Sequence, residues 1–236
     1  MKRGTKRSYQ TAAVRRAEGG YAITLDGKAM RTPASANLIL AHQPLAEAIA
    51  GEWRAQGEWI EPDTMPLTRY ANTVIDRVSP RRDQLVAELV KFAAHDLLCY
   101  REAVTEELMR RQAAAWDPWL AWAAERHGAR LATGKGVTHV AQSPKVLERL
   151  AAEIKAHDIH RLAVLHAGIT ITGSAVLGLA FVARVLDAQR AFETSRVDES
   201  YQAERWGRDG EAEAREARLL EDLKAAEYYL SLLPPA

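Results

Sequence analysis

The uncharged run from Leu162 to Ala183 constrains the fold more than any other feature of this 236-residue sequence. A run of this length without Asp, Glu, Lys or Arg could cross a bilayer as one helix. His166 lies within it, and Thr172-Gly173-Ser174 divides it into two shorter apolar pieces. We therefore predict two buried helices that meet near Gly173, and no integral membrane span.

The pattern of apolar residues changes after about residue 40, from short runs to helical periodicity. Short runs at residues 14–16, 21–25, 28–30 and 37–40 are separated by turn residues, and Asp26-Gly27 is typical of a tight hairpin turn. From Pro44 onward the apolar spacing is helical. The predicted fold class is α+β, with a small N-terminal antiparallel β-rich domain over residues 1–42 and a larger, mostly helical domain over residues 43–236.

Three local expectations can be tested against a structure. The short apolar run Leu97–Tyr100 could be a strand. In the long helix predicted over Thr105–His127, Asp117 could cap a new first turn at Pro118, so we expect a kink or short break there. The charged segment Asp198–Lys224 has helical spacing and is typical of a solvated helix face.

Composition and charge exclude several classes of protein. The chain has 32 basic and 31 acidic side chains, a net charge of +1, which argues against unspecific binding of nucleic acid. A single cysteine, Cys99, cannot form an intramolecular disulfide and fits a reducing compartment. The basic start, Met1–Arg7, is not followed by the apolar stretch of a secretory signal. We therefore expect a cytoplasmic protein.

No motif with the residues of a reaction centre emerges. Gly134-Lys135-Gly136 lacks the hydroxyl residue of a phosphate-binding loop. His157 and His160 flank Asp158 without the context of a zinc hydrolase, and a polar helix junction explains them as well. Cys99 lies in an apolar run, where a thiol is usually inert. We predict no catalytic residue, no metal and no cofactor; a metal-dependent or thiol enzyme is the alternative.

Eight groups of residues, taken in their order and spacing, resemble the ATP12 family, the assembly chaperones of F-type ATP synthase that attend the alpha subunit. They span nearly the whole chain: Leu25-Asp26-Gly27-Lys28, Arg31-Thr32-Pro33, Glu52-Trp53 with Gln56-Gly57, Met65 to Arg69, Asn72-Thr73, Asp96 to Arg101, Trp116-Asp117-Pro118, and Ser195 to Glu199 with Tyr201-Gln202 and Trp206-Gly207.

The resemblance implies a non-enzymatic role and a two-part fold. A chaperone of this kind would bind the unassembled alpha subunit of the catalytic head and shield its interface until beta subunit replaces it. The expected protein is bacterial and monomeric, and it binds neither nucleic acid nor a cofactor. A membrane-associated assembly factor that inserts Leu162–Ala183 is a further alternative.

The resemblance also indicates which residues bind the client. The functionally sensitive acidic position of the family falls on Asp198, which Glu199 follows. Gln202 and Trp206 stand four and eight residues after Asp198, on one side of a helix. We predict that Asp198, Glu199, Gln202 and Trp206 form a client-binding patch; the alternative is a helix cap at Asp198 and a packed Trp206.

Three further residues are predicted to support the fold. Trp53 lies in the apolar helical register of the helix that follows Pro44. Trp116 belongs to the apolar stripe of the helix over Thr105–His127, and Asp117 follows it. Trp119 and Trp122 lie away from that stripe, so this helix is expected to make contacts on two sides.

Overall fold

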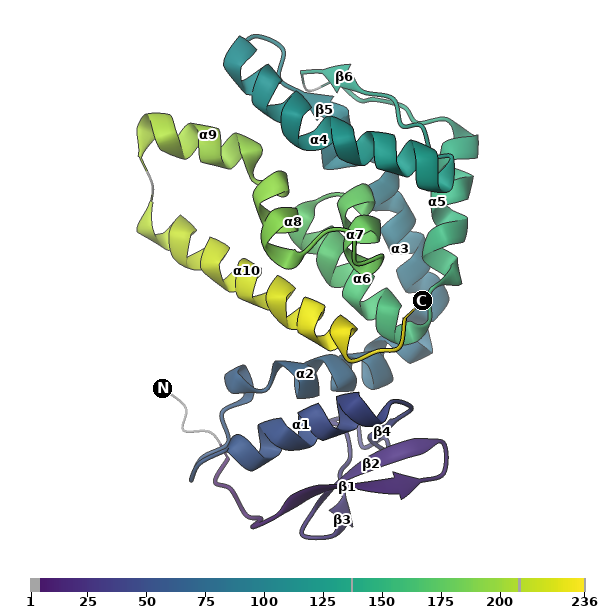
Figure 1. The fold of residues 1–236 in the computed structure, drawn as a ribbon, viewed down its shortest axis with the longest axis vertical. Coiled ribbons are helices and arrows are strands. Elements are labelled where there is room, and N and C mark those ends of the chain that lie inside the picture. The colour runs from purple at the N-terminus through teal and green to yellow at the C-terminus, as the bar shows by residue number, and fades with distance from the viewer. Residues whose placement is uncertain (1–4, 137, 208, 236) are drawn as a thin grey trace. The chain divides into compact units, whose positions relative to one another are not determined.

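The structure, a computed structural model, describes residues 5–136, 138–207 and 209–235. The chain divides into two compact units, Met1–Arg82 with Tyr228–Ala236 and Asp83–Glu227. This grouping differs from the expected division into residues 1–42 and 43–236, because the first helix packs against the sheet and the second helix packs against the first. The predicted fold class is confirmed: a small antiparallel sheet at the N-terminus is followed by a helical region (Figure 1).

The sheet of the first unit is built around strand β2. Strands β1 and β3 pair with β2 antiparallel on its two sides, and β4 also pairs with β2. Asp26 and Gly27 join β2 to β3 with φ values of 47° and 79°, so both have the positive φ that a type I′ turn requires. The strands are β1 Ala12–Ala17, β2 Gly20–Leu25, β3 Lys28–Ala29 and β4 Ile39–Leu40.

Two helices complete this unit. Helix α1, Gln43–Ala55, packs against β1 and β2, and helix α2, Pro66–Thr73, continues into a π-helical turn over Val74–Val78. The carboxylate of Glu52 in α1 accepts hydrogen bonds from the backbone N–H groups of Leu67 and Thr68, at 2.7 and 2.8 Å. It thereby satisfies donors that the first turn of α2 would otherwise leave unpaired.

The second unit consists of helices and one short parallel pair of strands. Strand β5, Tyr100–Arg101, pairs with β6, Gly134–Lys135. Helices α4 and α9 lie next to each other (Figure 1). The helices are α3 Arg82–Ala94, α4 Glu106–His127, α5 Pro144–Ala156, α6 Ile159–Thr172, α7 Ala175–Val182, α8 Ala188–Ser195, α9 Val197–Trp206 and α10 Gly210–Ser231, whose residues up to Glu227 belong to this unit.

The uncharged run forms two largely buried helices, as predicted. Gly173, with φ at 71°, ends α6, and the hydroxyl of Ser174 accepts from the backbone N–H of Leu177 to begin α7. The two helices touch through Gly178, where a Cβ would lie 2.5 Å from Cγ1 of Ile169. Every residue of α7 is buried. Among the described residues, no helix has both the length and the apolar character needed to span a bilayer.

The short break expected at Pro118 is wrong, because α4 continues from Glu106 to His127 with Pro118 inside it; a kink at this position stays a prediction. Pro118 and Ala114, whose carbonyl loses its helical partner, are both exposed, so water can satisfy that carbonyl. Asp117 does not cap a turn. Its carboxylate instead forms an ion pair with Arg101 at 2.7 Å.

Two other expectations need correction. Leu97–Cys99 is a turn of 3-10 helix rather than a strand, and only Tyr100 of the expected strand belongs to β5. The segment Asp198–Lys224 is divided between α9 and α10, because Gly207 ends α9 with a φ of 85°.

A fully buried carboxylate, that of Asp96, fixes the beginning of α7. One oxygen accepts from the backbone N–H of Leu98 and the other from that of Val176, each at 3.0 Å. Ser174 and Ala175 also donate hydrogen bonds to it. Burial nevertheless raises the pKa of Asp96 above its ordinary value, and these hydrogen bonds act in the opposite direction. The carboxylate therefore joins the turn after α3 to the positive end of the α7 dipole.

We predict that Asp96→Ala lowers the free energy of unfolding by roughly 3 kcal/mol or more, because it leaves several buried N–H groups without an acceptor. Asp117→Ala is the matched control: its side chain is 62% exposed, and loss of its ion pair should cost roughly 1 kcal/mol or less. Urea unfolding followed by circular dichroism measures both. Equal losses for the two variants would contradict this role of Asp96.

Candidate functional site

Helix α9 carries all four residues of the predicted patch, but it presents them on two faces. Asp198 faces α4, where its Oδ1 accepts a hydrogen bond from Nε2 of Gln112 at 2.7 Å. Glu199, Gln202 and Trp206 instead line a groove that α9 shares with the beginning of α10. The structure therefore brings three of the four together and places Asp198 behind them.

Asp198 is not the cap of α9. Arg196 occupies the capping position, and Asp198 lies in the first helical turn. Gln112 itself is 2% exposed, and its Oε1 accepts from the backbone N–H of Glu102 at 2.8 Å. This one amide thus connects α9 to the chain that precedes α4.

The surroundings of Asp198 disfavour its charged form. Burial raises the pKa of its carboxyl above the ordinary value, and the neighbouring carboxylates of Glu199 and Glu102 act in the same direction. The hydrogen bond from Gln112 lowers the pKa but does not compensate. A neutral acceptor at this position would therefore suit the contact at least as well as the carboxylate.

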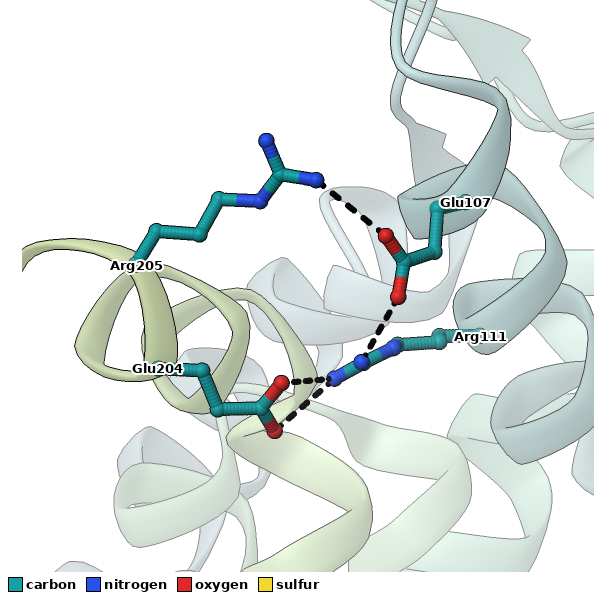
Figure 2. Close-up of polar contacts among 4 residues, drawn as sticks. All are labelled: Glu107, Arg111, Glu204 and Arg205. Carbon is teal, nitrogen blue, oxygen red and sulfur yellow. Dashed lines mark hydrogen bonds and ion pairs between the residues drawn. The ribbon is translucent and has the colours of Figure 1, made fainter.

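A network of ion pairs holds the other end of α9 against α4 (Figure 2). Arg111 of α4 donates to both carboxylate oxygens of Glu204, at 2.8 and 2.7 Å, and to Glu107 at 2.8 Å. Arg205 donates to the other oxygen of Glu107 at 3.1 Å. These two arginines hold the pKa of Glu107 below its ordinary value. Glu107 and Arg111, on adjacent turns of α4, thus form ion pairs with Arg205 and Glu204 of α9.

An aromatic side chain lies under this network. Tyr201 of α9 is 5% exposed, and the guanidinium groups of Arg111 and Arg205 lie 5.2 and 4.5 Å from the centre of its ring. Its hydroxyl is buried without a hydrogen-bond partner among the described residues. Apolar and cation–π contacts therefore account for the burial of Tyr201.

The groove between α9 and α10 has a volume of about 310 Å³. Trp206 is its largest side chain and is 77% exposed, so the alternative of a packed Trp206 is wrong. Its lining residues are Glu199, Ser200, Gln202, Ala203, Trp206, Gly207, Asp209, Ala212, Glu213 and Glu216.

The residues expected to support the fold occupy three different environments. Trp116 is fully buried, and its Nε1 donates to the carbonyl oxygen of Thr194 at 2.7 Å. Trp53 is half-buried beside the ring of Tyr9, whose hydroxyl donates to the Trp53 carbonyl at 2.6 Å. Asp117 is exposed and paired with Arg101. A structural role remains a prediction for all three, and it suits Trp116 best.

Sequence reasoning missed the partners that α4 supplies to α9. Gln112 and Arg111 lie more than eighty residues before Asp198 and Glu204, and a single polar residue on an amphipathic helix gives no sign of its partner. One signal was available: Glu107 and Arg111 are four residues apart on α4, a spacing that favours an ion pair.

The residues of the alternative enzyme hypothesis are placed for structural roles. Burial, together with the nearby Asp96, raises the pKa of Cys99 to about 12, so a reactive thiolate is scarce at neutral pH. Asp158 caps α6 by accepting from the backbone N–H groups of His160 and Arg161. No group of three or more metal-ligating side chains among the described residues is arranged to hold an ion.

Comparison with known proteins decides the family. The family model described as "ATP12 chaperone protein" matches residues 6–124, about half of the chain. The chain belongs to the ATP12 chaperone family. A curated relative, the mitochondrial protein atp12 of Schizosaccharomyces pombe, is 21% identical over 214 residues, which cover 86% of this chain and 74% of that protein. ATP12 proteins are chaperones of ATP synthase assembly, as the sequence resemblance implied.

Solved ATP12 structures share the fold. Atp12 from Paracoccus denitrificans is 43% identical with a TM-score of 0.94, and the match covers 96% of this chain and 97% of that one. A mutant of the same protein, with an aspartate replaced by lysine, matches equally well. The Atu1473 protein of Agrobacterium tumefaciens is 38% identical with a TM-score of 0.92, and the match covers 97% of this chain and 86% of that one.

We predict that Asp198→Asn is neutral or stabilising at pH 7, because the amide oxygen can still accept from Gln112 while the half-buried charge is removed. The pKa of Asp198 is higher in the folded chain than in the unfolded chain, so the carboxyl ionises more readily in the unfolded chain as the pH rises. Asp198 therefore lowers the free energy of unfolding of the wild type at pH values above its unfolded pKa, and the asparagine of the variant does not. Thermal melts of both proteins between about pH 3 and about pH 7 measure the difference. A variant that is less stable only at the higher pH would contradict the raised pKa.

The network of Figure 2 predicts a local effect on α9. Arg111→Ala removes the bridge between Glu107 and Glu204 and one contact to Tyr201, so amide hydrogen exchange in α9 should accelerate about tenfold. Arg110→Ala, an exposed arginine on the preceding position of α4, is the control and should leave α9 unchanged. The same exchange rates in both variants would show that the network does not hold α9.

Proposed function

We propose that this chain binds the unassembled alpha subunit of F-type ATP synthase and covers the surface that alpha later presents to beta. Membership of the ATP12 family supports a role in ATP synthase assembly. The exposed Trp206 in the α9–α10 groove supports this groove as the surface that binds the client. A tryptophan that remains 77% exposed is uncommon on a surface with no partner, and tryptophan is enriched where binding energy concentrates. Glu199 and Gln202 border it, and Asp198 supports the helix from behind.

Such a chaperone works by binding equilibria alone. A free alpha subunit exposes apolar interface that favours self-association, and a reversible cover lowers the concentration of that state. Beta subunit then displaces the cover, because the permanent interface is larger. The cycle needs no catalytic residue, no cofactor and no nucleotide hydrolysis. We further propose that the protein acts as a monomer in the bacterial cytoplasm and binds no nucleic acid.

The first test is protection of the client. Purified chaperone should suppress the aggregation of isolated alpha subunit in the absence of ATP, with suppression complete near an equimolar ratio. Light scattering at rising chaperone concentration measures this, with an unrelated protein of similar size as the control. Unchanged scattering at excess chaperone would end the proposal.

The second test separates binding from folding at Asp198. Asp198→Lys should weaken protection of alpha subunit severalfold and lower the thermal melt only modestly: lysine cannot accept the hydrogen bond of Gln112, but the Glu199 and Glu102 carboxylates can neutralise the new charge. The neutral variant Asp198→Asn is its control. A collapsed melt for Asp198→Lys would assign Asp198 to the fold alone, and full protection by that variant would exclude it from binding.

A further inference from the structure

Among the described residues that line the α9–α10 groove, the charges are of one sign. The ionisable ones are all acidic: Glu199, Asp209, Glu213 and Glu216. The described lining residues include no lysine and no arginine. Glu199 has a basic neighbour outside the groove, Arg196, at 3.0 Å. For the chain as a whole the charges nearly cancel, at +1, so this acidity is a local property of the groove.

The groove also has apolar lining residues. They are Trp206 and the small residues Ala203, Gly207 and Ala212, and Trp206 is 77% exposed, so side chains of a partner can reach the indole. The face of an indole ring attracts a cation as well as an apolar group. The carboxylates and the ring together match a ligand that is both basic and apolar.

The size and geometry of the groove disfavour smaller cationic ligands. A volume of about 310 Å³ is at the lower end for small-molecule sites, which also enclose most of their ligand, whereas Trp206 remains 77% exposed. The carboxylates do not approach one another as metal ligands within the described residues. A groove of this kind suits side chains that project from a larger partner.

We propose that the α9–α10 groove binds a basic amphipathic segment of the client, with an apolar side chain on Trp206 and lysine or arginine side chains among Glu199, Asp209, Glu213 and Glu216. This rests on the proposed function, in which the client is the alpha subunit. Charge complementarity selects a basic segment and disfavours an acidic one. The contact weakens as salt rises, because its charges are close to solvent.

The test uses two labelled synthetic peptides with the same amphipathic helical pattern, one of leucine and lysine and one of leucine and glutamate. Each labelled peptide is titrated with the full-length chain, and the fluorescence anisotropy of the peptide is measured. The anisotropy should rise for the lysine peptide alone, and added salt should weaken that binding. Trp206→Ala and Glu216→Lys should each weaken that binding about tenfold. Glu211→Lys makes the same change of charge on α10 outside the groove and should alter binding less than twofold.

Binding of both peptides with equal affinity, or binding of the lysine peptide that Trp206→Ala leaves unchanged, would overturn the groove assignment. Sedimentation of the chain alone tests another occupant: a dimer that Trp206→Ala dissociates would show that a second copy fills the groove, which also overturns it. If the wild type binds the lysine peptide through Trp206 but fails to protect alpha subunit, the client proposal fails while the basic-ligand groove stands.

Discussion

The helical unit depends on one buried carboxylate. Asp96 accepts hydrogen bonds from the turn after α3 and from the first residues of α7, so it fixes where α7 begins. Helix α7 is entirely buried and packs against α6 and α8. Helix α8 then leads directly into α9 through Arg196, whose guanidinium donates to the carbonyl oxygen of Ile171 in α6 at 2.9 Å. The position of α9 thus follows from packing that begins at Asp96.

Helix α9 uses its two faces for different purposes. One face is held to α4 by the Gln112–Asp198 hydrogen bond, the ion pairs of Figure 2 and the buried Tyr201. The other borders an open acidic groove and leaves Trp206 exposed. A preorganised helix loses less conformational freedom when it binds a partner. The contacts that hold one face of α9 to α4 therefore favour binding at the face that borders the groove.

The sequence predicted those parts of the fold that local patterns determine. Alternating apolar runs and Asp26-Gly27 indicated the sheet and its hairpin, and Gly173 marked the junction of two buried helices. The continuity of α4 through Pro118 could not be predicted, because it depends on solvent reaching Ala114. The sequence could predict which segment carries the site, but not which of its residues share a surface. Spacing placed Asp198 and Trp206 on one side of a helix, whereas Asp198 faces α4 because it accepts a hydrogen bond from the distant Gln112.

If the chaperone covers the surface that alpha presents to beta, beta subunit must displace it. A complex of chaperone and alpha subunit, isolated by size-exclusion chromatography, is mixed with purified beta subunit and separated again. The chaperone should then elute alone and alpha with beta, in proportion to the beta added and without nucleotide hydrolysis. A stable complex of all three proteins would contradict it, because the chaperone would then not occupy the surface that beta needs.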